Sequence, residues 1–147
     1  MFNIDEAEEL LDRWQDVLRL RDWDLRVDFV EKEWRKSGDV KIDCSNKVAI
    51  VLINNYNPKV TNLEALIIHE LLHIKLWGMD QMIEGLIYNV FGSDESDSKF
   101  SFAYDQFMNV LETTTEDLTK GFLAVGAKNK EVPFGYVEKQ VEEEINK

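Results

Sequence analysis

The sequence predicts an α+β domain in which an N-terminal helix is followed by a small, mostly antiparallel three-stranded sheet, a buried helix and C-terminal helices. Apolar residues recur at helical spacing before residue 20 and after residue 61, whereas residues 24–54 alternate in polarity or form apolar runs. The chain has 147 residues, which suits one domain, and its 44% hydrophobic content suffices for a core without disulfides. We expect this domain to occupy residues 1–126, with a charged C-terminal tail at residues 127–147.

The first half of the chain predicts one helix and three strands. An amphipathic helix is expected over about residues 4–20. Residues 24–30 alternate between apolar and charged side chains, which is typical of a half-buried strand. A second, short strand is expected after the Ser37-Gly38 turn, and it includes Val40, Ile42 and Cys44. The run Lys47–Asn54 is the strongest strand candidate because its middle is entirely apolar.

The helix that follows is predicted to be buried. The capping box Thr61-Asn62-Leu63-Glu64 indicates its start, and the helix is expected to run to Trp77 and stop at Gly78. Between these limits the apolar residues surround the helix almost completely, which is typical of a core helix. Any histidine or glutamate inside it must therefore be paired or ligated, because an unpaired buried charge is costly.

The remaining sequence predicts further helices joined by a polar loop. Residues 79–91 are expected to form a helix, residues 92–99 a solvated loop, and residues 100–123 a long helix. A last short helix is predicted at residues 137–145. The expected inner face of the 79–91 helix consists of Met82, Ile83, Leu86, Ile87 and Val90, and the apolar stripe of the long helix consists of Phe107, Leu111, Leu118 and Phe122.

Charge and cysteine content restrict the partners and the compartment. The net charge of −12 argues against nucleic acid, whose phosphates would be repelled, and against an anionic membrane surface. The single cysteine, Cys44, cannot form an internal disulfide and is expected to be a core residue. With no transmembrane run and no basic-then-apolar leader in view, we expect a cytoplasmic protein.

The pentapeptide His69-Glu70-Leu71-Leu72-His73 contains the only two histidines of the chain. Residues four apart lie on one helix face, so both imidazoles can bind one zinc ion. The glutamate after the first histidine can take a proton from water on that ion. This HExxH pattern therefore predicts His69 and His73 as metal ligands and Glu70 as the catalytic residue.

A catalytic zinc site needs a third protein ligand, and no third histidine exists. Cys44 is one formal possibility. Asp80 is too close along the chain to the second histidine unless the chain turns sharply at Gly78. The third ligand is therefore sought among acidic residues of the long C-terminal helix.

Glu112 is the preferred third ligand because it lies next to Leu111 and can face inward at the edge of the core. Glu116 lies one turn later on the same face and can hold the free N–H of a ligating histidine. Glu116 and Asp105 also remain open as alternative ligands. On the opposing interpretation, these acids are surface charges of an amphipathic helix.

At this point the chain resembles the gluzincin branch of the HExxH zinc metallopeptidases in a minimal, zincin-like form. The stretch Glu112–Leu118 is similar to the glutamate-bearing helix of ImmA/IrrE-type bacterial and phage metallopeptidases. The stretch Val48–His73 also resembles SprT-like proteins, which use a further histidine that this chain lacks. The resemblance covers about residues 20–123.

The resemblance implies a zinc-dependent metallopeptidase that hydrolyses peptide bonds in a protein or peptide through a metal-activated water, and its small size favours a phage-associated or regulatory enzyme. The strand Lys47–Asn54 would then be the edge strand that pairs with an extended substrate. Tyr56, Tyr88 and Tyr104 are candidate oxyanion donors. Two alternatives remain: a non-catalytic zincin-fold binding module, and a metal-dependent amide hydrolase acting on a non-protein substrate. The sequence leaves the oligomeric state open.

Overall fold

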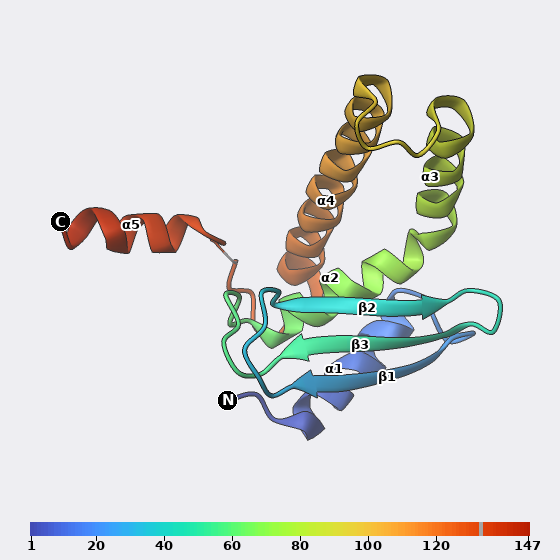
Figure 1. Ribbon diagram of the computed structural model, residues 1–147. Helices are drawn as coiled ribbons and strands as arrows, with labels where there is room; N and C mark the ends of the chain where they lie inside the picture. The colour runs from blue at the N-terminus through green and yellow to red at the C-terminus, as the bar shows by residue number, and fades with distance from the viewer. Residues whose placement is uncertain (133) are drawn as a thin grey trace.

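The computed structural model describes residues 1–132 and 134–147 of the chain (Figure 1). Within this part it contains five helices and three strands, which confirms the α+β class. In chain order the elements are α1 (Ile4–Val17), β1 (Asp24–Val30), β2 (Gly38–Asp43), β3 (Val48–Asn54), α2 (Leu63–Lys75), α3 (Trp77–Phe91), α4 (Ser98–Gly126) and α5 (Val137–Ile145).

The sheet has the strand order β1-β3-β2 and is mixed, so the expectation of a mostly antiparallel sheet is wrong. β2 and β3 form an antiparallel hairpin, whereas β1 and β3 run parallel (Figure 1). The chain after β1 crosses to the far edge before β2 begins, and β3 then returns between them. The expectation that residues 47–54 form an edge strand is therefore also wrong, because β3 is paired on both sides and β2 is an edge strand.

The hydrophobic core lies between one face of the sheet and the helices α1 and α2 (Figure 1). Alternate residues of β3 point into it, and Val51 and Ile53 are fully buried. Along α2, Ile67, Ile68 and Leu71 are fully buried. The structure thus confirms the prediction of a core helix, and α2 carries the two histidines at the edge of this core.

The start of α2 differs from the predicted capping box. Asn62, not Thr61, is the N-cap residue, and its side chain accepts a 3.2 Å hydrogen bond from the backbone N–H of Ala65. Glu64 does not reach back to the cap, because the Trp14 indole donates a 2.8 Å hydrogen bond to its buried carboxylate. This bond fixes α1 against the start of α2.

The chain bends between α2 and α3, two residues earlier than predicted. α2 ends at Lys75, Leu76 caps it, and Gly78 lies within the first turn of α3. Figure 1 shows α3 and the first part of α4 extending together beyond the sheet. Most of the expected inner face of α3 is therefore wrong: Ile87 is buried, but Met82, Leu86 and Val90 are exposed.

The buried face of α4 is also shifted from the predicted stripe. Leu118 is exposed, whereas two threonines take its place against α2. Thr115 and Thr119 donate their hydroxyls to the carbonyls of Leu111 and Thr115, at 2.7 and 2.8 Å. These small residues, satisfied within their own helix, let α4 approach α2 where the histidines lie.

Cys44 is exposed in the turn after β2, so the expectation of a core cysteine is wrong.

The segment after residue 126, expected as a charged tail, begins with residues that pack against the domain. Ala127 is buried, and the Asn62 side chain donates a 2.8 Å hydrogen bond to the carbonyl of Glu131. The predicted last helix is present as α5, which contains no buried residue and stands apart from the sheet in Figure 1. No helix in the described residues combines the length and apolar character that a membrane crossing requires.

Candidate metal centre

The structure brings His69, His73 and Glu112 together, and one donor atom from each lies within 4.8 Å of the others. The two histidines are one turn apart on α2, and Glu112 comes from α4, which packs against that face of α2. The ring nitrogens Nε2 of His69 and His73 are 3.2 Å apart. The Glu112 carboxylate oxygens lie 3.5 Å from His69 Nε2 and 3.3 Å from His73 Nε2.

These donors fit a zinc ion in both chemistry and spacing. Zinc prefers imidazole nitrogen and carboxylate oxygen, and bonds of about 2.0–2.1 Å in a tetrahedron place neighbouring donors roughly 3.3–3.4 Å apart. The two Nε2 atoms are 3.2 Å apart, and each lies close to this distance from a different Glu112 oxygen, 3.5 Å for His69 and 3.3 Å for His73. Among the described residues no fourth histidine, cysteine or acidic side chain joins this group.

Glu116 holds the other nitrogen of His69, as the sequence analysis anticipates. Its carboxylate oxygen lies 2.9 Å from His69 Nδ1. This hydrogen bond keeps a proton on Nδ1, so Nε2, which faces His73 and Glu112, is the nitrogen that could bind an ion after losing its own proton. Glu116 therefore orients the His69 ring, while Glu112 contacts both imidazoles.

Glu70 follows His69 on α2, lines the same hollows and is 5% exposed. Gly38, at the start of β2, lies against it: a Cβ atom at this glycine would be 3.0 Å from Glu70 Oε1 and 3.4 Å from the Leu52 carbonyl oxygen. From the sequence Gly38 is predicted only as part of a turn, because the approach of a strand to a helix far along the chain leaves no local signal. The glycine creates the space in which the carboxylate sits.

The charges of the cluster shift the pKa values of its members in opposite directions. Burial disfavours the charged form of His69, but hydrogen bonds to Glu112 and Glu116 outweigh it and raise the pKa to about 10. Burial and the neighbouring His69 charge lower the pKa of His73. The bond to His69 lowers the pKa of Glu112 and of Glu116. In the metal-free protein one imidazolium is thus shared between two carboxylates.

Glu70 shows the reverse behaviour. Its burial raises the pKa to about 7, against the opposing effect of the His69 charge. A carboxyl group with this pKa can exist in both protonation states near neutral pH, which suits a group that must accept and return a proton.

Two hollows flank the cluster, and Lys36, Gly38, His69 and Glu70 line both of them. The first, of about 270 Å³, has an apolar wall from Val60, Ala65 and Leu66. The second, of about 410 Å³, is lined on its far side by Trp77, Asp80, Met108 and Glu112. The His–Glu cluster therefore lies at the meeting point of two accessible hollows of different chemistry.

The other predicted site residues lie elsewhere. Asp105 is exposed on α4 and does not belong to the His69–His73–Glu112 group, and neither does the exposed Cys44. Tyr88 and Tyr104 stack with Phe100 between α3 and α4, and Tyr56 is 62% exposed. None of these tyrosines lines either hollow beside the histidines, so the structure gives no support to their role as oxyanion donors.

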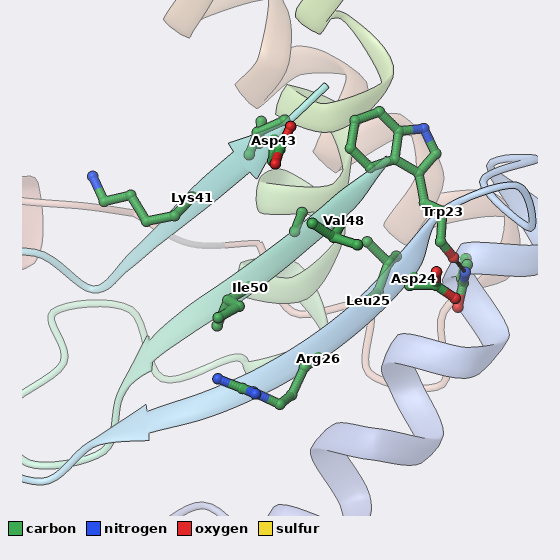
Figure 2. Close-up of a pocket in the computed structure, with 11 residues that line it drawn as sticks. Trp23, Asp24, Leu25, Arg26, Lys41, Asp43, Val48 and Ile50 are labelled. Atoms are coloured by element: carbon green, nitrogen blue, oxygen red, sulfur yellow. Dashed lines mark hydrogen bonds between the residues drawn. The ribbon is translucent and has the colours of Figure 1, made fainter. Parts of the chain in front are cut away.

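A larger hollow, of about 750 Å³, lies at the end of the sheet where β3 begins (Figure 2). There Arg26 and Lys41 extend from the two edge strands on either side of Ile50. Arg26 is paired with Asp28 at 2.9 Å, and Lys41 with Asp39 at 3.2 Å. The hollow contains no histidine, and β2 runs away from Glu70 towards it, so it is separate from the candidate metal centre.

Comparison of the chain with protein-family models, with curated proteins and with solved structures found no match. The functional argument therefore rests on the geometry of the cluster and its surroundings.

Proposed function

We propose that this chain is a zinc metallopeptidase of the gluzincin type, built on a minimal zincin-like fold. The observation that carries the proposal is the cluster of His69 Nε2, His73 Nε2 and the Glu112 carboxylate, with separations of 3.2, 3.5 and 3.3 Å that are close to the spacing of zinc ligands. The buried Glu70 follows His69 on the same helix and lines the same two hollows. A structural zinc site would be expected to use four protein ligands and to have no need of that glutamate.

In this proposal His69, His73 and Glu112 hold the ion, and Glu116 fixes the ring of His69 through Nδ1. A zinc ion bound there would supply Lewis acidity to a water molecule and to the substrate carbonyl. Glu70 would accept a proton from the attacking water on its carboxylate and return it to the leaving amine. In the metal-free protein burial raises the pKa of Glu70 to about 7, which increases its affinity for a proton.

The substrate peptide would bind in extended form along the free edge of β2. Val40 N–H points to this edge, because it bonds to Asp39 Oδ1 at 2.9 Å rather than to β3. The N–H of Gly38, two residues earlier, points to the same edge, because the direction of the backbone N–H groups alternates along a strand. An added strand would thus pass directly beside Glu70 and the histidines. This corrects the sequence-based choice of residues 47–54 as the pairing strand.

Lys36 is the cation that lines both hollows beside the cluster, and it replaces the tyrosines as the candidate partner of the carbonyl oxygen. Its ammonium group is held 2.8 Å from Asp39 Oδ2. The sequence does not single out Lys36 for this role, because lysines are common beside turns.

The first test is metal content, measured by mass spectrometry on protein loaded with zinc and dialysed. We expect about one zinc per chain for the wild type and for Asp105→Ala, which removes an exposed carboxylate from the same helix. Glu112→Ala should lose the metal or bind it at least about tenfold more weakly. Zinc retained at full strength in Glu112→Ala would reject Glu112 as a ligand, and no zinc in the wild type would reject the proposal.

The second test separates a peptidase from a binding module. Glu70→Gln keeps the size of the side chain but cannot accept the proton. It should retain zinc and lose peptide hydrolysis, measured on a fluorogenic peptide library, by about 10²–10⁴-fold. Hydrolysis that survives in Glu70→Gln would contradict the assigned role of this residue.

A further inference from the structure

The hollow of about 410 Å³ beside His73 and Glu112 contains a buried carboxylate that the proposed mechanism does not use. Asp80 of α3 lines this hollow and is 8% exposed. Among the described residues its carboxylate receives one side-chain hydrogen bond, a long one of 3.4 Å from Gln81. No buried side-chain oxygen among the described residues lacks a hydrogen-bond partner, so the second oxygen of Asp80 is accessible and free to receive a donor from a ligand.

The surroundings of Asp80 are acidic. Glu112 and Asp39 line the same hollow, and its cations are Lys36 and, in the metal-free protein, the His69 imidazolium. Lys36 is held by Asp39 at 2.8 Å, and His69 pairs with Glu112 at 3.5 Å. Burial, together with the charges of Glu84 and Glu112, raises the pKa of Asp80. Asp80 thus has no cationic partner among the described residues, and a cationic group in the hollow would supply one.

The other walls of the hollow suit a long, partly apolar cation. Trp77 and Met108 lie on the same side as Asp80. An aromatic face and a thioether can cover the aliphatic stem of an arginine or lysine, and the indole can also stack on a guanidinium. The hollow across the cluster has Val60, Ala65 and Leu66 instead, so the two sides differ in the side chain they favour.

We propose that the Asp80 hollow binds the side chain of an arginine or lysine of the substrate peptide, and that Asp80 determines this specificity by pairing with the cation. The inference rests on the proposed function, because the peptide must lie along β2 for its side chain to enter. The net charge of −12 favours the approach of a basic protein or peptide to this site.

The test uses two small probes on the zinc-loaded protein: arginine hydroxamate and citrulline hydroxamate. Both carry a metal-binding hydroxamate and side chains of nearly equal size, but only arginine is charged. Isothermal titration should give at least about tenfold tighter binding of the arginine probe, as a charge-assisted hydrogen bond to a buried carboxylate provides. Asp80→Asn should reduce the preference to about twofold or less.

Glu84→Gln is the matched control, because it removes the same charge one turn later on α3 from a residue that does not line the hollow. It should keep the arginine preference. If zinc binds but the two hydroxamates bind equally, or neither binds, or Asp80→Asn keeps the preference, the inference is overturned and the zinc site stands. If zinc itself does not bind, the proposed function is overturned and the specificity inference with it.

Discussion

Gly38→Ala is the substitution that tests most directly whether the contact between β2 and Glu70 is functional. The added Cβ would lie 3.0 Å from Glu70 Oε1 and 3.4 Å from both Glu70 Cγ and the Leu52 carbonyl oxygen. The carbonyl belongs to the central strand and cannot move easily. The Glu70 carboxylate must therefore shift by a few tenths of an ångström, away from β2.

The expected cost in stability is small. Overpacking of this kind costs about 1–3 kcal/mol, while alanine in a strand gains roughly 0.5–1 kcal/mol over glycine through its lower backbone entropy. The free energy of unfolding should thus fall by about 0–2.5 kcal/mol, measured by urea denaturation. Zinc content should not change, because the three atoms nearest to the added Cβ belong to Glu70 and Leu52 rather than to a proposed ligand.

The expected cost in hydrolysis is larger, because a displaced general base works poorly even when it is present. A loss of roughly 10–100-fold in kcat/KM is expected. Gly85→Ala on α3 is the control, since nothing lies within 4 Å of its added Cβ. It should stabilise the protein by about 0.5–1 kcal/mol and leave hydrolysis unchanged. Full hydrolysis in Gly38→Ala would refute the argument that this glycine positions Glu70.

Three further predictions concern protons and the core. Zinc binding at about pH 8 should release close to one proton from His69, because its pKa of about 10 keeps the ring charged in the metal-free protein. Glu116→Gln should reduce this proton release. Calorimetry in buffers of different ionisation enthalpy measures the number of protons released. The raised pKa of Glu70 means that the folded state keeps its proton longer than the unfolded state, so metal-free wild-type protein should lose stability as the pH rises from 4.5 to about 7. Glu70→Gln should lack this loss in urea titrations across that range, and equal slopes for both proteins would contradict the assigned burial effect. Trp14→Phe removes the 2.8 Å bond to buried Glu64 and should lower the unfolding free energy by about 1–3 kcal/mol without changing zinc content.

The part of the site that could be predicted from the sequence is the part that helical periodicity encodes. His69 and His73 share a face because they are four residues apart, and Glu112 and Glu116 share one for the same reason. The apolar surroundings of α2 required the polar residues to find partners, and a later helix with acids beside an apolar stripe was the available source. Two local patterns therefore predicted a contact between α2 and α4.

The parts that could not be predicted depend on pairing between distant segments. The apolar run indicates a strand at 47–54 but not the neighbours of that strand, so its central position became visible only with the register of β1 and β2. The same is true of Glu64, which fits a capping box in sequence but is bonded by Trp14, fifty residues away. Met82 and Leu86 have core spacing, yet α3 leaves the body after the bend at Leu76 and exposes them.

The polar cluster also explains how α2 can be buried before any metal binds. His69, raised in pKa by Glu112 and Glu116, carries one positive charge between two carboxylates, and the lowered pKa of His73 keeps that ring neutral. The proton on His69 thus serves in the metal-free protein as the charge that an ion would otherwise supply. Because the apolar core of α1, α2 and the sheet is complete without the ligands, zinc should add stability by mass action rather than be required for folding. Circular dichroism of chelator-treated protein should therefore retain the helical signal, with a lower melting temperature that zinc restores. If the metal-free chain is unfolded, zinc is required for folding, and the site behaves as a structural zinc centre.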